Sequence, residues 1–115
     1  MDNTDIMTKS KVFALRVIVL YKYLSETKNE HVMSRQLLQS STAIGLRVRD
    51  VTLDQPIVNY NAALRAADES AYWLELLYGS QYLDKEQFSL IYSECSEIIF
   101  LLMSLVKTQN IGRNK

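Results

Sequence analysis

The sequence contains few turn-forming residues and a single cysteine. Three glycines and one proline among 115 residues are too few for the many tight turns of a β-sandwich or β-barrel. The lone Cys95 excludes an internal disulfide framework and is typical of a reducing compartment. No apolar run reaches the roughly 18 residues that cross a bilayer, and the polar, acidic N-terminus is unlike a signal peptide. We therefore expect a cytoplasmic protein with no membrane partner.

An excess of either charge is also lacking. Thirteen Lys and Arg residues balance thirteen Asp and Glu residues, which argues against a generic polyanion binder. A hydrophobic share of 48% excludes a disordered chain, and the length fits one domain over residues 1–115.

Four amphipathic segments fill that domain. In the first, apolar residues such as Ile6, Phe13 and Val17 recur on one face at helical spacing. Pro56 suits the first turn of the third segment, and Asp84 with Gln87 has the spacing of a capping box before the fourth. The predicted helices cover about residues 5–25, 30–52, 56–78 and 85–108. Matched lengths and short connections predict an all-α protein, an antiparallel up-down-up-down four-helix bundle.

Two of these helices have more apolar residues than one core-facing stripe needs. On the first helix the surplus lies opposite the core stripe, and on the fourth it lies on the back or a flank. The residues concerned are Val12, Leu15, Val19, Tyr23, Leu90, Phe100 and Leu101. Isolated exposed apolar residues are common, but a repeated stripe favours a buried contact. We therefore predict a homo-oligomer that uses the backs of these two helices.

Residues for catalysis or metal binding are scarce. His31 is the only histidine, so the helical Glu-x-x-His pairs of di-iron bundles cannot form. Glu94 and Glu97 could ligate a metal, but a solvated helix face explains them better. Cys95 falls on the core stripe, as a small buried hydrophobe does. We predict no catalytic, cofactor-binding or metal site and no small-molecule substrate.

Nucleic-acid binding is the alternative function. Lys9 and Arg16 share a flank of the first helix, whereas Arg47 and Arg49 point about 160° apart on the second. One subunit therefore lacks a continuous phosphate-binding stripe, although an oligomer could pool these four cations to bind RNA or DNA. The Tyr72-Trp73 pair could stack on bases, but packing or subunit contact is the favoured interpretation.

The two halves of the chain differ in charge. Residues 1–53 carry eight cations against five acids, a net charge of +3, and residues 54–110 carry three against eight, a net charge of −5. A head-to-tail ring of copies could use this polarity between subunits.

The order and spacing of several motifs resemble a known family. The most recognisable stretches are Ser34-x-Gln36-Leu37-Leu38-x-Ser40-x-Thr42-x-Ile44-Gly45 and Ala67-x-Glu69-Ser70-x-Tyr72-Trp73-Leu74-x-Leu76-Leu77, with Ser10-x-x-Phe13-Ala14 before them and Glu94-x-x-Glu97-Ile98 after them. These motifs resemble the bacterial four-helix-bundle proteins encoded by intervening sequences in 23S ribosomal RNA genes, and more distantly the accessory proteins of diversity-generating retroelements. The resemblance implies a ring-shaped homopentamer without known enzymatic activity. Its retroelement relatives are basic and are thought to bind nucleic acid.

Overall fold

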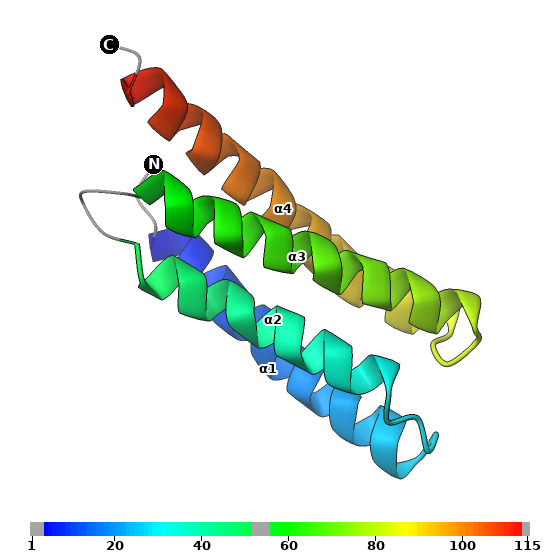
Figure 1. The fold of residues 1–115 in the computed structure, drawn as a ribbon. Helices are drawn as coiled ribbons and strands as arrows, with labels where there is room; N and C mark the ends of the chain where they lie inside the picture. The colour runs from blue at the N-terminus through cyan, green and yellow to red at the C-terminus, as the bar shows by residue number, and fades with distance from the viewer. Residues whose placement is uncertain (1–3, 52–55, 114–115) are drawn as a thin grey trace.

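The computed structural model describes residues 4–51 and 56–113, which form four helices and no strand. The helices are α1 (Thr4–Glu26), α2 (Met33–Arg49), α3 (Pro56–Gly79) and α4 (Lys85–Arg113). Successive helices run in opposite directions in an elongated molecule of 52 × 21 × 19 Å (Figure 1). The predicted all-α four-helix bundle is confirmed.

The helices form two layers. Figure 1 shows α2 and α3 side by side in front, with α1 behind α2 and α4 behind α3. The contact between α2 and α3 is the most extensive and that between α1 and α4 the least. Small side chains allow the close α2–α3 approach, and the buried hydroxyls of Ser40 and Ser70 hydrogen bond across it at 2.8 Å. The α1–α4 side of the bundle is therefore its most open side.

Each connection has a local chemical cause. In the connection between α1 and α2, Asn29 has a left-handed backbone conformation (φ 56°), which asparagine tolerates better than most residues. Glu30 follows, and its carboxylate accepts hydrogen bonds from the backbone N–H groups of Val32, Met33 and Ser34 at 2.7–3.1 Å. Helix α2 consequently begins at Met33, so the predicted start at residue 30 was three residues early.

The turn between α3 and α4 confirms one prediction and corrects another. Asp84 and Gln87 form the reciprocal capping box, with each side chain bound to the other residue's backbone N–H. The predicted end of the third helix at residue 78 was one residue early, because Gly79 is the last residue of α3, and Gln81 beyond it has the left-handed conformation (φ 70°). Helix α4 extends to Arg113, five residues past its predicted end.

The core is formed by one stripe from each helix. The apolar periodicity of α4 also fits a stripe through Ile99 and Val106, but the structure buries Ile98 and Leu105 and leaves those two half-buried, so the stripe is rotated toward α1. Among the described residues, every buried side-chain nitrogen or oxygen atom has a hydrogen-bond partner. The buried polar groups of the described core are thus satisfied within the chain.

Candidate functional site

Two ion pairs join α1 to α4 where the bundle is most open. Lys9 Nζ lies 2.5 Å from a carboxylate oxygen of Glu97, and Arg16 Nε lies 2.7 Å from one of Glu94. Hydrogen bonding to Glu97, together with its charge, raises the pKa of Lys9. These contacts pair four charges within one chain.

Large apolar side chains accompany these paired charges on the outer surface of α1 and α4. We call this surface the α1/α4 face and define it by five exposed residues: Val12, Leu15, Val19, Leu90 and Phe100. The most exposed are Leu90 (72%), Phe100 (69%) and Val19 (68%). The other two residues of the predicted set, Tyr23 and Leu101, are half-buried and pack against the core.

A groove of about 450 Å³ runs along the seam between α1 and α4. Val19, Leu20 and Tyr23 line it from α1, and Leu90 and Ile91 line it from α4. The Arg16–Glu94 ion pair lies at its margin. The α1/α4 face is therefore an apolar groove with internally paired charges, a surface suited to an apolar partner.

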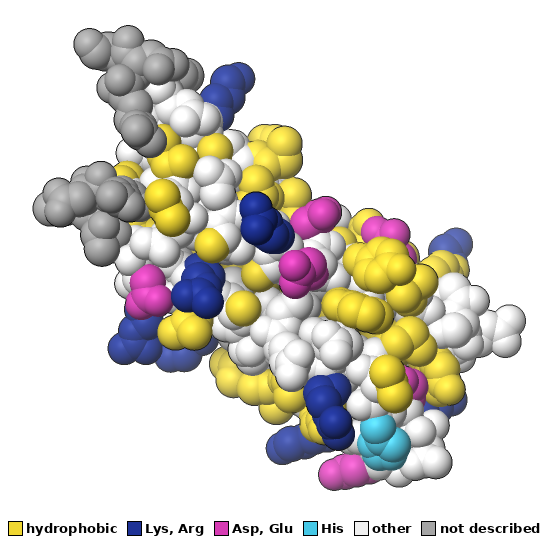
Figure 2. Space-filling model, in the orientation of Figure 1, with side chains coloured by type: hydrophobic (Ala, Val, Ile, Leu, Met, Phe, Trp, Pro, Cys, Tyr) yellow, Lys and Arg dark blue, Asp and Glu magenta, His cyan; other side chains and the backbone are white. Residues whose placement is uncertain are grey.

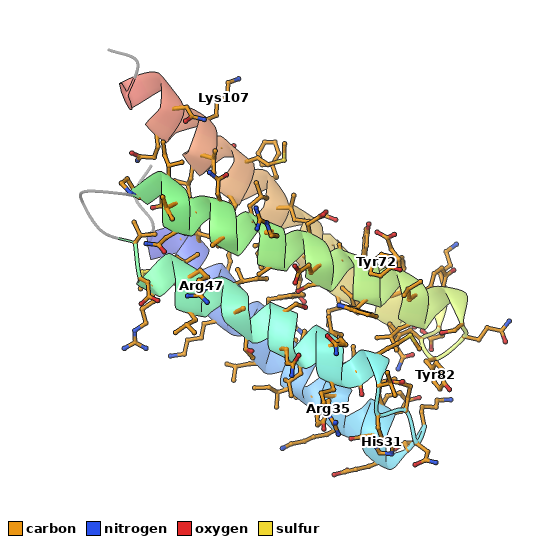
Figure 3. The ribbon with its side chains drawn as sticks, in the orientation of Figure 1. His31, Arg35, Arg47, Tyr72, Tyr82 and Lys107 are labelled. Carbon is orange, nitrogen blue, oxygen red and sulfur yellow. The ribbon has the colours of Figure 1, made fainter. Side chains whose placement is uncertain are left out.

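The structure does not bring the four predicted nucleic-acid contacts together. Lys9 and Arg16 are engaged by carboxylates on the α1/α4 side. Arg47 projects from α2 on the opposite, α2–α3 side of the molecule (Figure 3). Arg49 lines a different groove, of about 570 Å³ between α1 and α2, together with Lys11. Sequence reasoning did not place Lys11 and Arg49 at one groove, because residues of α1 and α2 share it only once the two helices pack.

The residues considered for metal binding or reactivity all make contacts within the bundle. Glu94 and Glu97 are the acids of the two ion pairs. Cys95 is buried, and its thiol donates a hydrogen bond to the Ala67 carbonyl at 3.3 Å. Burial, reinforced by the charges of Asp68 and Glu75, raises the pKa of this thiol to about 12. Within residues 4–51 and 56–113, no three His, Cys, Asp or Glu side chains are grouped to hold a metal ion.

Tyr72 and Trp73 have different environments although they are neighbours. Trp73 is half-buried and packs against the core, whereas Tyr72 is 54% exposed and projects from α3 (Figure 3). Their rings meet edge to face at 5.3 Å. Packing, the favoured interpretation, accounts for Trp73 and leaves Tyr72 on the surface.

By length and composition, one helix among the described residues could cross a membrane. The Lys85–Asn110 part of α4 reaches a mean hydropathy of 1.6, yet only 28% of that apolar window is buried inside the bundle. Ile91, Cys95, Ile98 and Leu102 from this stretch belong to the bundle core. Helix α4 is thus apolar on more than its core face.

Comparison with known proteins agrees with this fold. A solved structure of a protein with unknown function from the S23 ribosomal protein family of Bacteroides thetaiotaomicron VPI-5482 is 39% identical, with a TM-score of 0.89. The alignment covers 93% of this chain and 99% of that one. A comparison with curated proteins gives no match. Residues 2–104 match the family described as 23S rRNA-intervening sequence protein, and this chain belongs to that family.

Proposed function

We propose that this protein is a non-enzymatic scaffold that assembles with copies of itself through the α1/α4 face. The assembly is the ring of five copies that the family resemblance implies. Its role is to present surfaces to other molecules rather than to transform a substrate.

One observation carries the proposal: Val19 and Leu90, each more than two-thirds exposed, line one groove between α1 and α4 on the outer surface of the bundle. Burying such side chains against another protein contributes roughly 25 cal/mol per Å² of apolar surface. Leaving them in water, aligned on two adjacent helices, is unusual for a monomer.

Two further features support the α1/α4 face as the site of self-association. The charges beside the groove are already paired within the subunit, so an apolar partner need not strip solvent from isolated charges. The apolar character of α4 on a second side is also expected of a helix that packs into its own bundle and against a neighbouring subunit.

The alternative, a nucleic-acid-binding accessory factor, has less support from the geometry. It must draw on cations that lie on different sides of the bundle, two of which are held by carboxylates. Phosphate-driven binding falls steeply with salt. Binding of labelled RNA or DNA at low salt, lost as salt is raised, would favour this alternative; no binding at low salt would exclude it.

Charge introduced into the groove tests the proposed scaffold. We expect Val19→Asp and Leu90→Asp each to shift the mass measured by light scattering toward that of one chain, because a carboxylate would be buried in an apolar contact. Gln39→Asp is the matched control, since it adds the same charge at an exposed position of α2. Circular dichroism must show all variants helical. An unchanged assembly in both groove variants would refute the proposed surface.

A further inference from the structure

A second surface, on the side of the bundle where α3 meets α4, combines carboxylates with aromatic rings. We call it the α3/α4 face and define it by Asp68, Tyr72, Glu75, Tyr78 and Tyr92. Asp68, Tyr72, Glu75 and Tyr78 are exposed, and Tyr92 is half-buried. In Figure 2, acidic side chains and a group of apolar side chains lie next to each other over this half of the molecule.

The aromatic part of the α3/α4 face is an ordered column. Tyr78 stacks on Phe88 with ring centroids 4.3 Å apart, and Phe88 stacks on Tyr92 at 4.7 Å. The Tyr92 hydroxyl donates a hydrogen bond of 2.7 Å to the Glu75 carboxylate. This bond fixes the carboxylate beside the aromatic column and does not neutralise it.

Negative charge converges on this face. The hydrogen bond to Glu75, burial, and the charges of Glu75 and Asp68 together raise the pKa of Tyr92 to about 12. The ion pairs among the described residues are Lys9–Glu97 and Arg16–Glu94, so no described Lys or Arg pairs with Asp68 or Glu75. The face therefore holds two carboxylates that form no ion pair with the described part of the chain.

We propose that the α3/α4 face binds an arginine-containing segment of another protein, with arginines three residues apart. Asp68, Tyr72 and Glu75 follow one another along α3 at helical spacing, which places the two carboxylates about 10 Å apart with the exposed ring between them. A segment in the polyproline II conformation has three residues per turn and advances about 3.1 Å per residue, so every third side chain lies on the same side and repeats at about 9 Å.

Arginine fits this surface better than lysine. Its planar guanidinium pairs with a carboxylate through two parallel N–H groups and also stacks on an aromatic face. The chain's own cations fit poorly, because the described Lys and Arg residues outside the two ion pairs, all but Lys28, are fixed on the four helices rather than spaced along one extended segment. The occupant is accordingly a segment of a different protein, and the site is separate from the α1/α4 face.

A labelled peptide tests the inference on the full chain. The probe is a fluorescein-labelled peptide of repeated Arg-Ser-Ser units, with Lys-Ser-Ser and Glu-Ser-Ser repeats for comparison, followed by fluorescence anisotropy. We expect the arginine peptide to bind most tightly, the glutamate peptide not to bind, and affinity to fall as salt is raised.

Variants locate the site. Joint replacement Asp68→Asn with Glu75→Gln should weaken arginine-peptide binding at least about fivefold. Tyr72→Leu should weaken it about threefold, because it removes the π face and keeps an apolar side chain. Glu26→Gln, an exposed carboxyl on α1, is the control and should bind as the wild type does.

Three results would overturn the inference. The first is no binding of the arginine peptide at low salt, and the second is equal binding by the wild type and the Asp68–Glu75 double variant. The third is a lower mass for that double variant by light scattering, which would make a second copy the occupant. The Val19→Asp result is independent of these outcomes, so failure here leaves the proposed scaffold standing.

Discussion

Cys95 illustrates at the residue scale how packing removes reactivity. Its thiol lies in the core, and its pKa is raised to about 12 by burial and by two nearby carboxylates. The thiolate is the reactive form of cysteine. We expect native protein to resist iodoacetamide near neutral pH and to be alkylated fully once unfolded in guanidinium chloride. Rapid alkylation of the native protein, followed by mass spectrometry, would contradict this position of the thiol.

Gly45 is a second residue whose role the structure sharpens. It lies in the middle of α2, and the structure places it beside Ser10 on α1. A Cβ atom built on Gly45 would meet Ser10 Oγ at 3.4 Å, which is tolerable contact. Because glycine costs a helix interior about 1 kcal/mol relative to alanine, Gly45→Ala should raise the free energy of unfolding by up to about that amount. Chemical denaturation measures this, and a clear loss of stability would mean that the helices approach more closely than described.

At the scale of elements, the start of α2 depends on one buried carboxylate. Burial opposes ionisation of Glu30, but hydrogen bonds from the backbone N–H groups of Ser34, Met33 and Val32 outweigh it, so the pKa of Glu30 is lowered from its ordinary value of 4.5. Stability that comes from the ionised carboxylate is therefore present above pH 4.5 and is lost as the pH falls through the lower, folded-state pKa.

Glu30→Gln tests this linkage. We expect the variant to be about 1 kcal/mol less stable at pH 7, the usual effect of losing a helix cap. The difference from the wild type should shrink as the pH is lowered below 4.5, because protonation removes the same charge from Glu30. Urea titrations across this range measure the difference, and a gap that is constant with pH would show that the carboxylate charge is not what matters.

The elements themselves were largely predictable from the sequence. Apolar periodicity located all four helices, and Asp84 with Gln87 marked the start of α4 correctly. The start of α2 was misplaced because glutamate is common inside helices, so Glu30 was assigned to the helix. In the structure it precedes the helix, and its carboxylate accepts a hydrogen bond from the Ser34 backbone N–H. The rotated core stripe of α4 also escaped prediction, because a helix that is apolar on several sides does not reveal which side faces its own bundle.

At the scale of the whole molecule, the candidate surfaces were only partly predictable. Periodicity singled out seven surplus apolar residues, of which five are exposed, whereas Tyr23 and Leu101 are half-buried against the core. The Lys9–Glu97 and Arg16–Glu94 pairs escaped prediction because they join residues 88 and 78 positions apart in the sequence. The same holds for the α3/α4 face, where Glu75 and Tyr92 meet only after the last two helices pack.

Charge polarity is also a property of the whole molecule. The basic N-terminal half and the acidic C-terminal half of the sequence become opposite edges of the bundle, with Lys11 and Arg49 at the α1–α2 groove and Asp68 and Glu75 on the α3/α4 face. A neutral total therefore coexists with two surfaces of opposite charge, and the apolar α1/α4 face lies between these two edges.

The most direct test of the proposed scaffold is the mass of the wild-type protein in solution. Light scattering after size-exclusion chromatography at micromolar concentration should give five times the 13.3 kDa of one chain. A mass of one chain across that concentration range would contradict the proposal that the exposed apolar residues of α1 and α4 bind another copy.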